Sequence, residues 1–253
     1  ERSCMAKLQT ENNVALRIEN VCKRFGGVIA SDDVSFELRY GEVFGLIGPN
    51  GSGKTTLINL ITGIYKVDSG KIIMPSGDIT KMSIHGRARE GIIRTFQHPR
   101  LLEDCDLRTN IYVGMDLARK RGKKQDRVLL DRLMDAANLN VDLNVTMDKL
   151  SYGQQKLLEI VRAILAEPSV LLLDEPAAGL NHKEMDYIRE LIDIALERRT
   201  AVLLIEHAMD FVMDICDRIT VLNFGHQIAS GVPSEIQTNL QVIEAYLGRS
   251  HNA

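Results

Sequence analysis

Eight consecutive residues, Gly48 to Thr55, have the composition of a loop that binds phosphate groups. They read Gly-Pro-Asn-Gly-Ser-Gly-Lys-Thr, which matches the spacing of a P-loop. Glycines allow backbone N–H groups to turn toward phosphate oxygens without a side-chain clash. We expect the Lys54 ammonium to reach the β- and γ-phosphates and the Thr55 hydroxyl to ligate Mg²⁺. The predicted phosphate-binding residues are Gly48, Pro49, Asn50, Gly51, Ser52, Gly53, Lys54, Thr55 and Thr56.

The segments on either side of this loop are those that a P-loop needs. Residues 42–47 read Glu-Val-Phe-Gly-Leu-Ile, which is typical of a buried strand, and residues 54–60 begin a predicted helix. The N-terminus of that helix adds unpaired N–H donors and a partial positive charge. An ordinary glycine-rich turn is the alternative, but such a turn does not require strand, loop, Lys-Thr and helix in this order.

Two adjacent carboxylates stand at the end of another predicted strand. Asp174 and Glu175 follow the apolar run 170–173, and Pro176 ends it. Open α/β sheets bind ligands at the carboxyl ends of their strands, so we expect both carboxylates beside the P-loop. Asp174 is suited to contact Mg²⁺ directly or through water, and Glu175 is suited to polarise a water for attack on the γ-phosphate. A solvated strand end is the alternative interpretation.

Gln97 and His207 also follow predicted strands, which cover residues 91–96 and 201–205. We expect the Gln97 amide to bond a Mg²⁺-bound water and to sense the γ-phosphate. A neutral His207 imidazole can donate to the γ-phosphate, and its cation would stabilise developing charge. Alone, each residue would more often be an ordinary surface residue, and its position at a strand end is what favours the functional interpretation. The other five histidines are interpreted as structural.

A second helix N-terminus is predicted at Leu150-Ser151-Tyr152-Gly153-Gln154. Ser151 is a favourable N-cap, and apolar residues recur along the helix that follows. One interpretation is simply the start of a core helix. The other is a second anion site formed by Ser151, Gly153 and Gln154. Such a site has no use inside one monomer, but it has a clear use if it faces the nucleotide held by another monomer.

Composition limits the class of protein. The 253 residues are 45% hydrophobic and 26% charged, with a net charge of -3 and a pI near 6.1. This excludes a general electrostatic attraction to nucleic acid or anionic lipid. No apolar run approaches the ~18 residues needed to span a bilayer, and the N-terminus, where Met5 is the expected start, lacks the apolar core of a signal peptide. The four cysteines have no CxxC spacing, so we expect reduced thiols in the cytosol.

The hydrophobic pattern predicts an α/β fold. Alternating residues in 14–18 and 34–38 are typical of half-buried strands, which suggests an antiparallel sheet beside the P-loop. Continuous apolar runs at 170–173 and 201–205 are typical of central parallel strands covered on both faces. Helical periodicity dominates from about 99 to 166. We therefore expect an α/β core with helices inserted in its middle.

Over nearly its full length the chain resembles the ATP-binding-cassette (ABC) ATPases. The P-loop is similar to the Walker A motif of that family, residues 150–154 to its signature motif and residues 171–175 to Walker B. Gln97 and His207 stand where the Q-loop glutamine and the switch histidine belong. Phe25 resembles the aromatic residue that stacks on adenine.

The resemblance implies a single ABC ATPase domain over residues 14–248, with tails at 1–13 and 249–253. It implies a P-loop NTPase (RecA-like) core with an antiparallel β-subdomain and an α-helical subdomain inserted at about 99–166. It also implies a head-to-tail dimer that binds ATP and Mg²⁺. Each ATP would lie between the P-loop of one subunit and the signature of the other, and hydrolysis would drive coupled membrane domains.

Several segments are similar to the branched-chain amino acid importer ATPases of the LivG type. They are Arg94-Thr95-Phe96-Gln97, Ser151-Tyr152-Gly153-Gln154-Gln155, Glu175-Pro176-Ala177-Ala178-Gly179-Leu180-Asn181, Ile205-Glu206-His207 and the tail Val242-Ile243-Glu244-Ala245-Tyr246-Leu247-Gly248. The similarity implies ATP hydrolysis that powers amino-acid import through separate integral-membrane permease subunits. The other implied partners are a second ABC ATPase subunit, in a hetero- or homodimer, and indirectly a periplasmic or extracellular solute-binding protein. The implied location is cytoplasmic, peripheral on the inner face of the cell membrane, and no nucleic-acid partner is expected.

The motifs leave several other functions of ABC ATPases open. Urea and short-chain amide importers and the lipopolysaccharide-export ATPase share much of this motif set, although the tail favours the importer branch. A soluble ABC ATPase of iron–sulfur assembly lacks this type of tail. Translation factors of the superfamily carry two cassettes and repair ATPases contain a long coiled coil, neither of which the sequence indicates. A pure nucleotide-binding regulator would be expected to lose Glu175 or His207.

Some residues depart from the family pattern. Tyr152 replaces the first glycine of the signature, and Asn181 stands where most relatives carry the D-loop aspartate. Residues 119–124, Arg-Lys-Arg-Gly-Lys-Lys, form a local basic run. We interpret it as a solvated loop, with contact to lipid headgroups or to a permease loop as the alternative.

Overall fold

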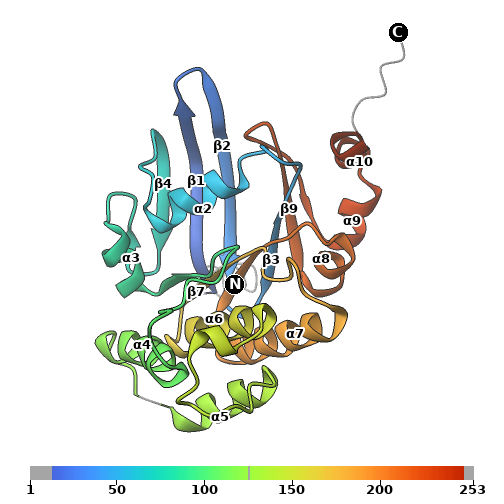
Figure 1. Ribbon diagram of the computed structural model, residues 1–253. Helices are drawn as coiled ribbons and strands as arrows, with labels where there is room; N and C mark the ends of the chain where they lie inside the picture. Colours follow the sequence, from blue (N-terminus) through green and yellow to red (C-terminus); the bar gives the residue numbers. More distant parts are fainter. Residues whose placement is uncertain (1–12, 125, 248–253) are drawn as a thin grey trace, which may run out of the picture.

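The computed structural model describes residues 13–124 and 126–247, which form two sheets with helices around them (Figure 1). The expected tails, 1–13 and 249–253, lie outside the described residues except for residue 13, and so do Cys4 and Met5. Cys22, Cys105 and Cys216 are free, which confirms the prediction of reduced thiols for these three.

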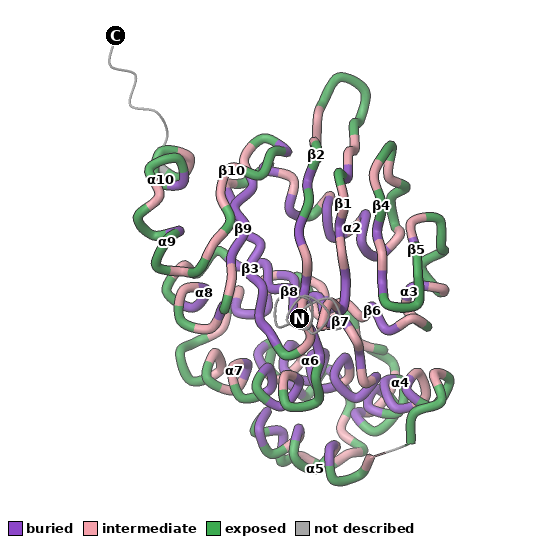
Figure 2. Tube along the Cα trace, turned by 180° about the vertical axis from the view of Figure 1, so that it is seen from behind, coloured by how far each residue is buried: buried purple, intermediate pink, exposed green. Residues whose placement is uncertain are grey.

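The first sheet is antiparallel and has the strand order β2-β1-β4-β5. β1 (Val14–Phe25) and β2 (Val28–Arg39) form a long hairpin, and β4 (Ser69–Met74) pairs with β1 and with β5 (Gly77–Asp78). β1 and β2 extend well beyond the predicted segments 14–18 and 34–38. Their distal ends are exposed or half-buried, so no apolar alternation marks them in the sequence (Figure 2).

The second sheet has the strand order β10-β9-β3-β8-β7-β6. The strands from β9 to β6 are parallel, and β10 is an antiparallel edge strand. These strands are β3 (Val43–Ile47), β6 (Ile92–Arg94), β7 (Val170–Asp174), β8 (Ala201–Ile205), β9 (Arg218–Asn223) and β10 (His226–Gly231). Every residue of β3, β7 and β8 is buried, because both faces of the sheet are covered.

One hydrophobic core lies on each face of the parallel sheet. The first joins it to the antiparallel sheet and to α2 (Lys54–Thr62). The second joins it to the remaining long helices, of which α4, α5 and α6 gather at one end of the molecule (Figure 1). The other helices are α3 (Ile84–Glu90), α4 (Leu107–Lys120), α5 (Arg127–Ala136), the 3₁₀ helix η1 (Met147–Lys149), α6 (Tyr152–Leu165), α7 (His182–Glu197), α8 (Met209–Ile215), α9 (Pro233–Thr238) and α10 (Leu240–Leu247). The predicted α/β fold, with an antiparallel sheet and helices inserted between β6 and β7, is confirmed.

One predicted strand is shorter than expected. Residues 91–96 were expected in a strand, but β6 ends at Arg94. The N–H of Phe96 faces Oε2 of Glu159 at 3.4 Å instead of a neighbouring strand, so the ladder stops before Gln97. Within the described residues, no helix combines the length and the apolar composition that crossing a membrane requires.

Candidate functional site

The predicted phosphate-binding loop connects β3 to α2 at the carboxyl end of the parallel strands. Gly48, Gly51 and Gly53 have φ angles of 149°, 79° and 107°, in the region that glycine adopts without strain. A Cβ atom at Gly53 would also lie 2.3 Å from the carbonyl oxygen of Ala30. The loop therefore needs glycine at position 53 for two independent reasons.

Lys54 and Ser52 carry two buried polar groups of this loop. The Nζ atom of Lys54 donates to the carbonyl oxygens of Gly48, at 2.7 Å, and Pro49, at 3.1 Å. Burial lowers the pKa of Lys54, and two nearby carboxylates act in the opposite direction. Among the described residues, the buried hydroxyl of Ser52 has no hydrogen-bond partner. A phosphate chain would supply acceptors for both groups, so the loop fits a nucleotide.

A pocket of about 320 Å³ opens over this loop. Its lining contains these predicted nucleotide-binding residues: Phe25, Asn50, Gly51, Ser52, Gly53, Lys54, Thr55 and Thr56. It also contains the predicted catalytic residues Glu175 and His207, and three residues that were not predicted, Val28, Ile29 and Ala30. Phe25 is 43% exposed as a residue, and its ring meets that of Tyr65 edge-to-face, with centroids 5.2 Å apart. An exposed aromatic ring beside a phosphate-binding loop is suited to stack on a nucleotide base.

The structure brings Glu175, Gln97 and His207 together at the ends of three strands. Gln97 Nε2 donates to Oε2 of Glu175 at 2.8 Å, and His207 Nε2 lies 3.0 Å from Oε1 of the same carboxylate. Glu175 has a φ of 50°, which is uncommon outside glycine, and its N–H donates to the carbonyl of Ile205 at 2.9 Å. Backbone outliers of this kind cluster at functional sites. The carboxylate is held where it can accept a proton from a water in the pocket.

Asp174 is buried at the end of β7, and its Oδ2 pairs with Nη2 of Arg94 at 2.7 Å. Nη1 of Arg94 donates to Asn59 of α2 at 2.6 Å, which links the helix after the P-loop to β7. The part of the chain that the structure describes holds no group of three or more His, Cys, Asp or Glu suited to a metal ion. The oxygen donors of Thr55, Gln97 and Asp174 nevertheless fit Mg²⁺, which commonly takes one or two carboxylates together with substrate phosphates.

The predicted signature residues form the N-terminus of α6. Ser151 Oγ accepts from the N–H of Gln154 at 3.2 Å, and the Gln154 side chain accepts from the N–H of Ser151 at 2.9 Å. A Cβ atom at Gly153 would lie 2.0 Å from Oε1 of Glu184, which is in a capping box with Asn181 at the start of α7. Ser151, Gly153 and Gln154 do not line the pocket over the P-loop. The structure does not bring them to the P-loop of their own chain.

Residues 31–178 match the family model described as ABC transporter. The chain belongs to the ABC transporter family. As a member it is an ATP-binding subunit with ATPase activity, which confirms the resemblance seen in its motifs. Residues 226–252 of this cassette match a second model, described as Branched-chain amino acid ATP-binding cassette transporter.

Individual relatives agree with the family models. The cassette is 40% identical to the high-affinity branched-chain amino acid transport ATP-binding protein LivG of Salmonella typhimurium, over 93% of this chain and 98% of that protein. It is 38% identical to the corresponding protein BraF of Pseudomonas aeruginosa, with the same coverage. Among solved structures, the ADP conformation of MJ1267, an ATP-binding cassette of an ABC transporter, aligns with a TM-score of 0.80 and 32% identity. That alignment covers 93% of this chain and 99% of the other.

Glu206 is a further residue of this cassette that the motifs do not identify. It is 3% exposed, its Oε1 accepts from the N–H of Ala177 at 2.6 Å, and its Oε2 accepts from the N–H of His207 at 2.9 Å. Glu206 therefore links the loop after Glu175 to the loop that carries His207. Glu206 stands in the segment Ile205-Glu206-His207 that resembles the LivG-type ATPases, but that similarity assigned it no role. An acidic residue directly after a buried strand is otherwise its signal, and many exposed strand ends share it.

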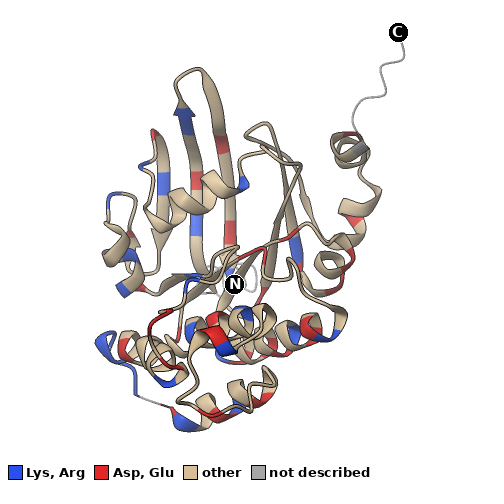
Figure 3. Cartoon of the chain, viewed as in Figure 1, with Lys and Arg blue, Asp and Glu red and all other residues tan. Residues whose placement is uncertain are grey.

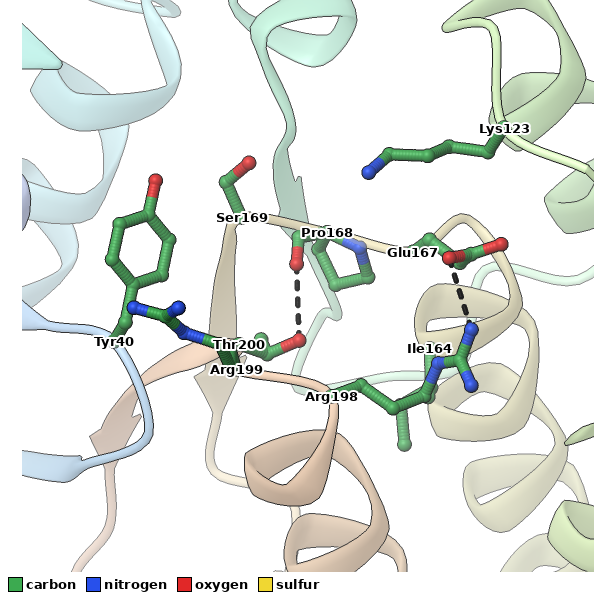
Figure 4. A pocket seen from close by; sticks show the side chains of 9 residues that line it. All are labelled: Tyr40, Lys123, Ile164, Glu167, Pro168, Ser169, Arg198, Arg199 and Thr200. Carbon is green, nitrogen blue, oxygen red and sulfur yellow. Dashed lines mark hydrogen bonds and ion pairs between the residues drawn. The ribbon is translucent and has the colours of Figure 1, made fainter. Parts of the chain in front are cut away.

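A second pocket of the cassette, of about 360 Å³, is shown in Figure 4. Ser169 and Thr200, which line it, directly precede β7 and β8, so it lies at the amino ends of the parallel strands. Arg198 pairs with Glu167 in this pocket at 3.1 Å, and Thr200 donates to the carbonyl of Pro168 at 3.0 Å. None of the predicted site residues lines it. Because open α/β sheets bind ligands at the opposite ends of their strands, this pocket is not the nucleotide site.

The basic run 119–124 lies at the end of α4 and in the loop that follows it (Figure 3). Arg119 and Lys120 are exposed, and each pairs with Asp116 at 2.6 Å. Arg121 instead turns inward, and its Nη1 donates to two backbone carbonyls just after α6, at 2.9 and 2.7 Å. The interpretation of the run as a solvated loop is therefore wrong for Arg121, which satisfies carbonyls that the end of α6 leaves free.

Proposed function

We propose that this cassette hydrolyses ATP to power the import of branched-chain amino acids through separate permease subunits. The observation that carries the proposal is the match of residues 226–252 to the branched-chain amino acid transporter model. Identities of 40% to LivG and 38% to BraF over 93% of the chain support it. Of the alternatives left open by the motifs, lipopolysaccharide export has a relative too, LptB of Haemophilus influenzae, but its identity of 31% over 92% of this chain is lower than that of LivG and BraF.

In the proposed reaction ATP lies along the P-loop, with its adenine on Phe25 and its β- and γ-phosphates bound by Lys54. Glu175 accepts a proton from the attacking water as the water oxygen bonds to the γ-phosphorus. The bond from the γ-phosphorus to the β,γ-bridging oxygen breaks, which gives ADP and phosphate. Gln97 orients the water, and His207 donates a hydrogen bond to the γ-phosphate as negative charge shifts in the transition state.

Mg²⁺ is the proposed cofactor of this reaction. Thr55, Asp174 and Gln97 would hold it, the last through a bound water. The metal would neutralise charge on the phosphate oxygens when bound. Arg94 fixes one oxygen of the Asp174 carboxylate, so the other oxygen is the one we assign to the metal or to its water.

The complete site is proposed to need a second cassette. Ser151, Gly153 and Gln154 begin a helix, so their backbone N–H groups and the helix dipole favour an anion. We assign that anion as the γ-phosphate of ATP held on the P-loop of a partner cassette, identical or related. The remaining proposed partners are integral-membrane permeases and, indirectly, a periplasmic or extracellular solute-binding protein. The cassette would then lie on the inner face of the cell membrane.

Copurification followed by transport tests the proposal. Affinity purification of this chain from detergent-solubilised membranes of its own cells should yield two polytopic permeases and a second cassette. The reconstituted complex, with its binding protein, should move labelled leucine across vesicle membranes when ATP is supplied on the cassette side. A complex with Lys54→Ala is the matched control. A lipopolysaccharide-export apparatus, or leucine movement no faster than in the control, would overturn the importer proposal.

A further inference from the structure

We propose that Tyr152, Lys156 and Glu159 of α6 position both the Gln97 loop and the loop after Glu175 for ATP hydrolysis. The inference rests on the proposed functions of Gln97 and Glu175. Spacings of four and three residues place the three side chains on one face of the helix. We call these three residues the α6 clasp. They are positioning residues, because each acts through the residues that it holds.

Lys156 holds the loop that follows Glu175. It is 2% exposed, and its Nζ donates to the carbonyl oxygens of Glu175, Pro176 and Ala178 at 2.6, 3.2 and 3.1 Å. No ion pair joins Lys156 to a carboxylate among the described residues. Burying an ammonium group is costly unless all of its donors are satisfied, and here three carbonyls of one short loop satisfy them. Lys156 therefore fixes the carbonyl side of the loop after Glu175, while Ile205 and Glu206 accept from N–H groups of Glu175 and Ala177.

Glu159 holds the Gln97 loop from the other side. It is 4% exposed, its Oε1 accepts from the N–H of Arg100 at 2.9 Å, and its Oε2 faces the N–H of Phe96 at 3.4 Å. These two N–H groups flank Gln97 in the chain. Burial raises the pKa of Glu159, and the two backbone N–H groups lower it, as does the charge of Arg162 at 3.9 Å.

Tyr152 contacts both the Gln97 loop and the loop after Glu175. Its hydroxyl donates to the carbonyl of Gln97 at 3.3 Å. Its ring packs against Gly179, where an added Cβ atom would lie 3.3 Å from the ring, and it lies 5.7 Å from Nζ of Lys156. Glycine, the usual residue of the ABC signature at this position, could make none of these side-chain contacts. This departure from the family pattern therefore has a physical consequence, because it adds a bridge between the Gln97 loop and the loop after Glu175.

The clasp couples the position of the N-terminus of α6 to the position of the Glu175 carboxylate. Ser151, which caps α6, is proposed to face the nucleotide of the partner cassette. A helix moves as a rigid element, so a shift of Ser151 on docking must also shift the groups that hold Gln97 and Glu175. In this way the approach of the partner would adjust the hydrolytic site of the same chain that supplies the signature.

The test separates hydrolysis from ATP binding in the purified complex that contains this chain, its second cassette and the permeases. Lys156→Met keeps the aliphatic stem and removes the three hydrogen bonds to the loop after Glu175. We expect kcat to fall at least ~10-fold, because even a small displacement of the Glu175 carboxylate from the attacking water slows hydrolysis. The Kd for ATP should stay within about threefold of the wild-type value, since no clasp residue lines the pocket over the P-loop. Lys156→Gln, which can still donate two hydrogen bonds, should recover part of kcat. Lys149→Met is the matched control, because Lys149 precedes α6 but is exposed.

A double-mutant comparison distinguishes positioning from a merely structural role. In a Glu175→Gln background, Lys156→Met should change the residual rate less than about twofold, because residues that act through one another are not additive. If Lys156→Met fails to fold, Lys156→Gln and the exposed substitution Tyr152→Phe carry the test, each with a lowered kcat and an unchanged Kd. Hydrolysis by the wild type together with unchanged kcat in these variants would overturn the clasp alone. Absence of hydrolysis in the wild-type complex, with its second cassette present, would overturn the proposed function, and the clasp with it.

Discussion

Nε2 of His207 lies 3.0 Å from Oε1 of Glu175, although the two residues are 32 positions apart in the sequence. The sheet accounts for this proximity, because β7 and β8 are adjacent parallel strands whose carboxyl ends carry the two residues. Gln97, which follows the next strand, β6, reaches the other oxygen of the same carboxylate. The proposed catalytic group therefore depends on strand order rather than on closeness in the sequence.

Lys54→Ala should weaken ATP binding about 10- to 100-fold, because a buried hydrogen bond to a charged group is lost. Isothermal titration of the purified protein with ATP measures the effect. Lys81→Ala is the matched control, since Lys81 is an exposed lysine outside the pocket. Wild-type affinity in Lys54→Ala would contradict the assignment of Lys54 to the phosphates.

Substituting alanine for Gly51 and for Gly53 of the P-loop should lower the free energy of unfolding by different amounts. Gly51→Ala should cost about 1 kcal/mol, because φ is 79° but no atom lies within 4 Å of the added Cβ. Gly53→Ala should cost about 3 kcal/mol or more. At this position the positive φ strains alanine, and the added Cβ also clashes with the carbonyl oxygen of Ala30. Urea unfolding of the two variants measures the difference. Equal free energies of unfolding would show that the backbone at Ala30 moves away freely.

Cys216 should be chemically inert in the folded protein. Burial, with a smaller effect from Asp217, raises the pKa of its thiol to about 12, from 9.0. The reactive form is the thiolate, so at about pH 8 the thiol should stay protonated and resist iodoacetamide. In urea the same residue should be alkylated. Mass spectrometry of digested samples reports each cysteine separately, and rapid alkylation of Cys216 in the folded protein would contradict its burial.

The parts of the site that the sequence predicts are those with local signals. Spacing alone identifies the P-loop, and apolar runs followed by polar residues identify the strand ends at Asp174 and Ile205. Parallel strands then place those ends at one edge, which is why Glu175 and His207 could be expected together. The extent of β1 and β2 could not be predicted, because their exposed ends lack apolar alternation.

The residues that hold the site in place could not be predicted for a different reason. Arg94 pairs with Asp174 at a separation of 80 residues, and Glu159 meets Phe96 at a separation of 63. Buried charged residues have no spacing rule, since any partner on the facing element satisfies them. The inward orientation of Arg121 could not be predicted for the same reason. A basic run is ordinarily solvated, and Arg121 turns inward because it donates to two free carbonyls just after α6.

The most direct measurement of the central claim is ATP hydrolysis by Glu175→Gln in the presence of Mg²⁺. Glutamine has nearly the same shape and keeps one acceptor oxygen for Gln97 or His207, but it is a far weaker base. The account predicts a hydrolysis rate at least ~100-fold below wild type, with ATP still bound and the cassettes trapped as an ATP-bound dimer. Hydrolysis close to the wild-type rate would contradict the assignment of Glu175 as the residue that activates water.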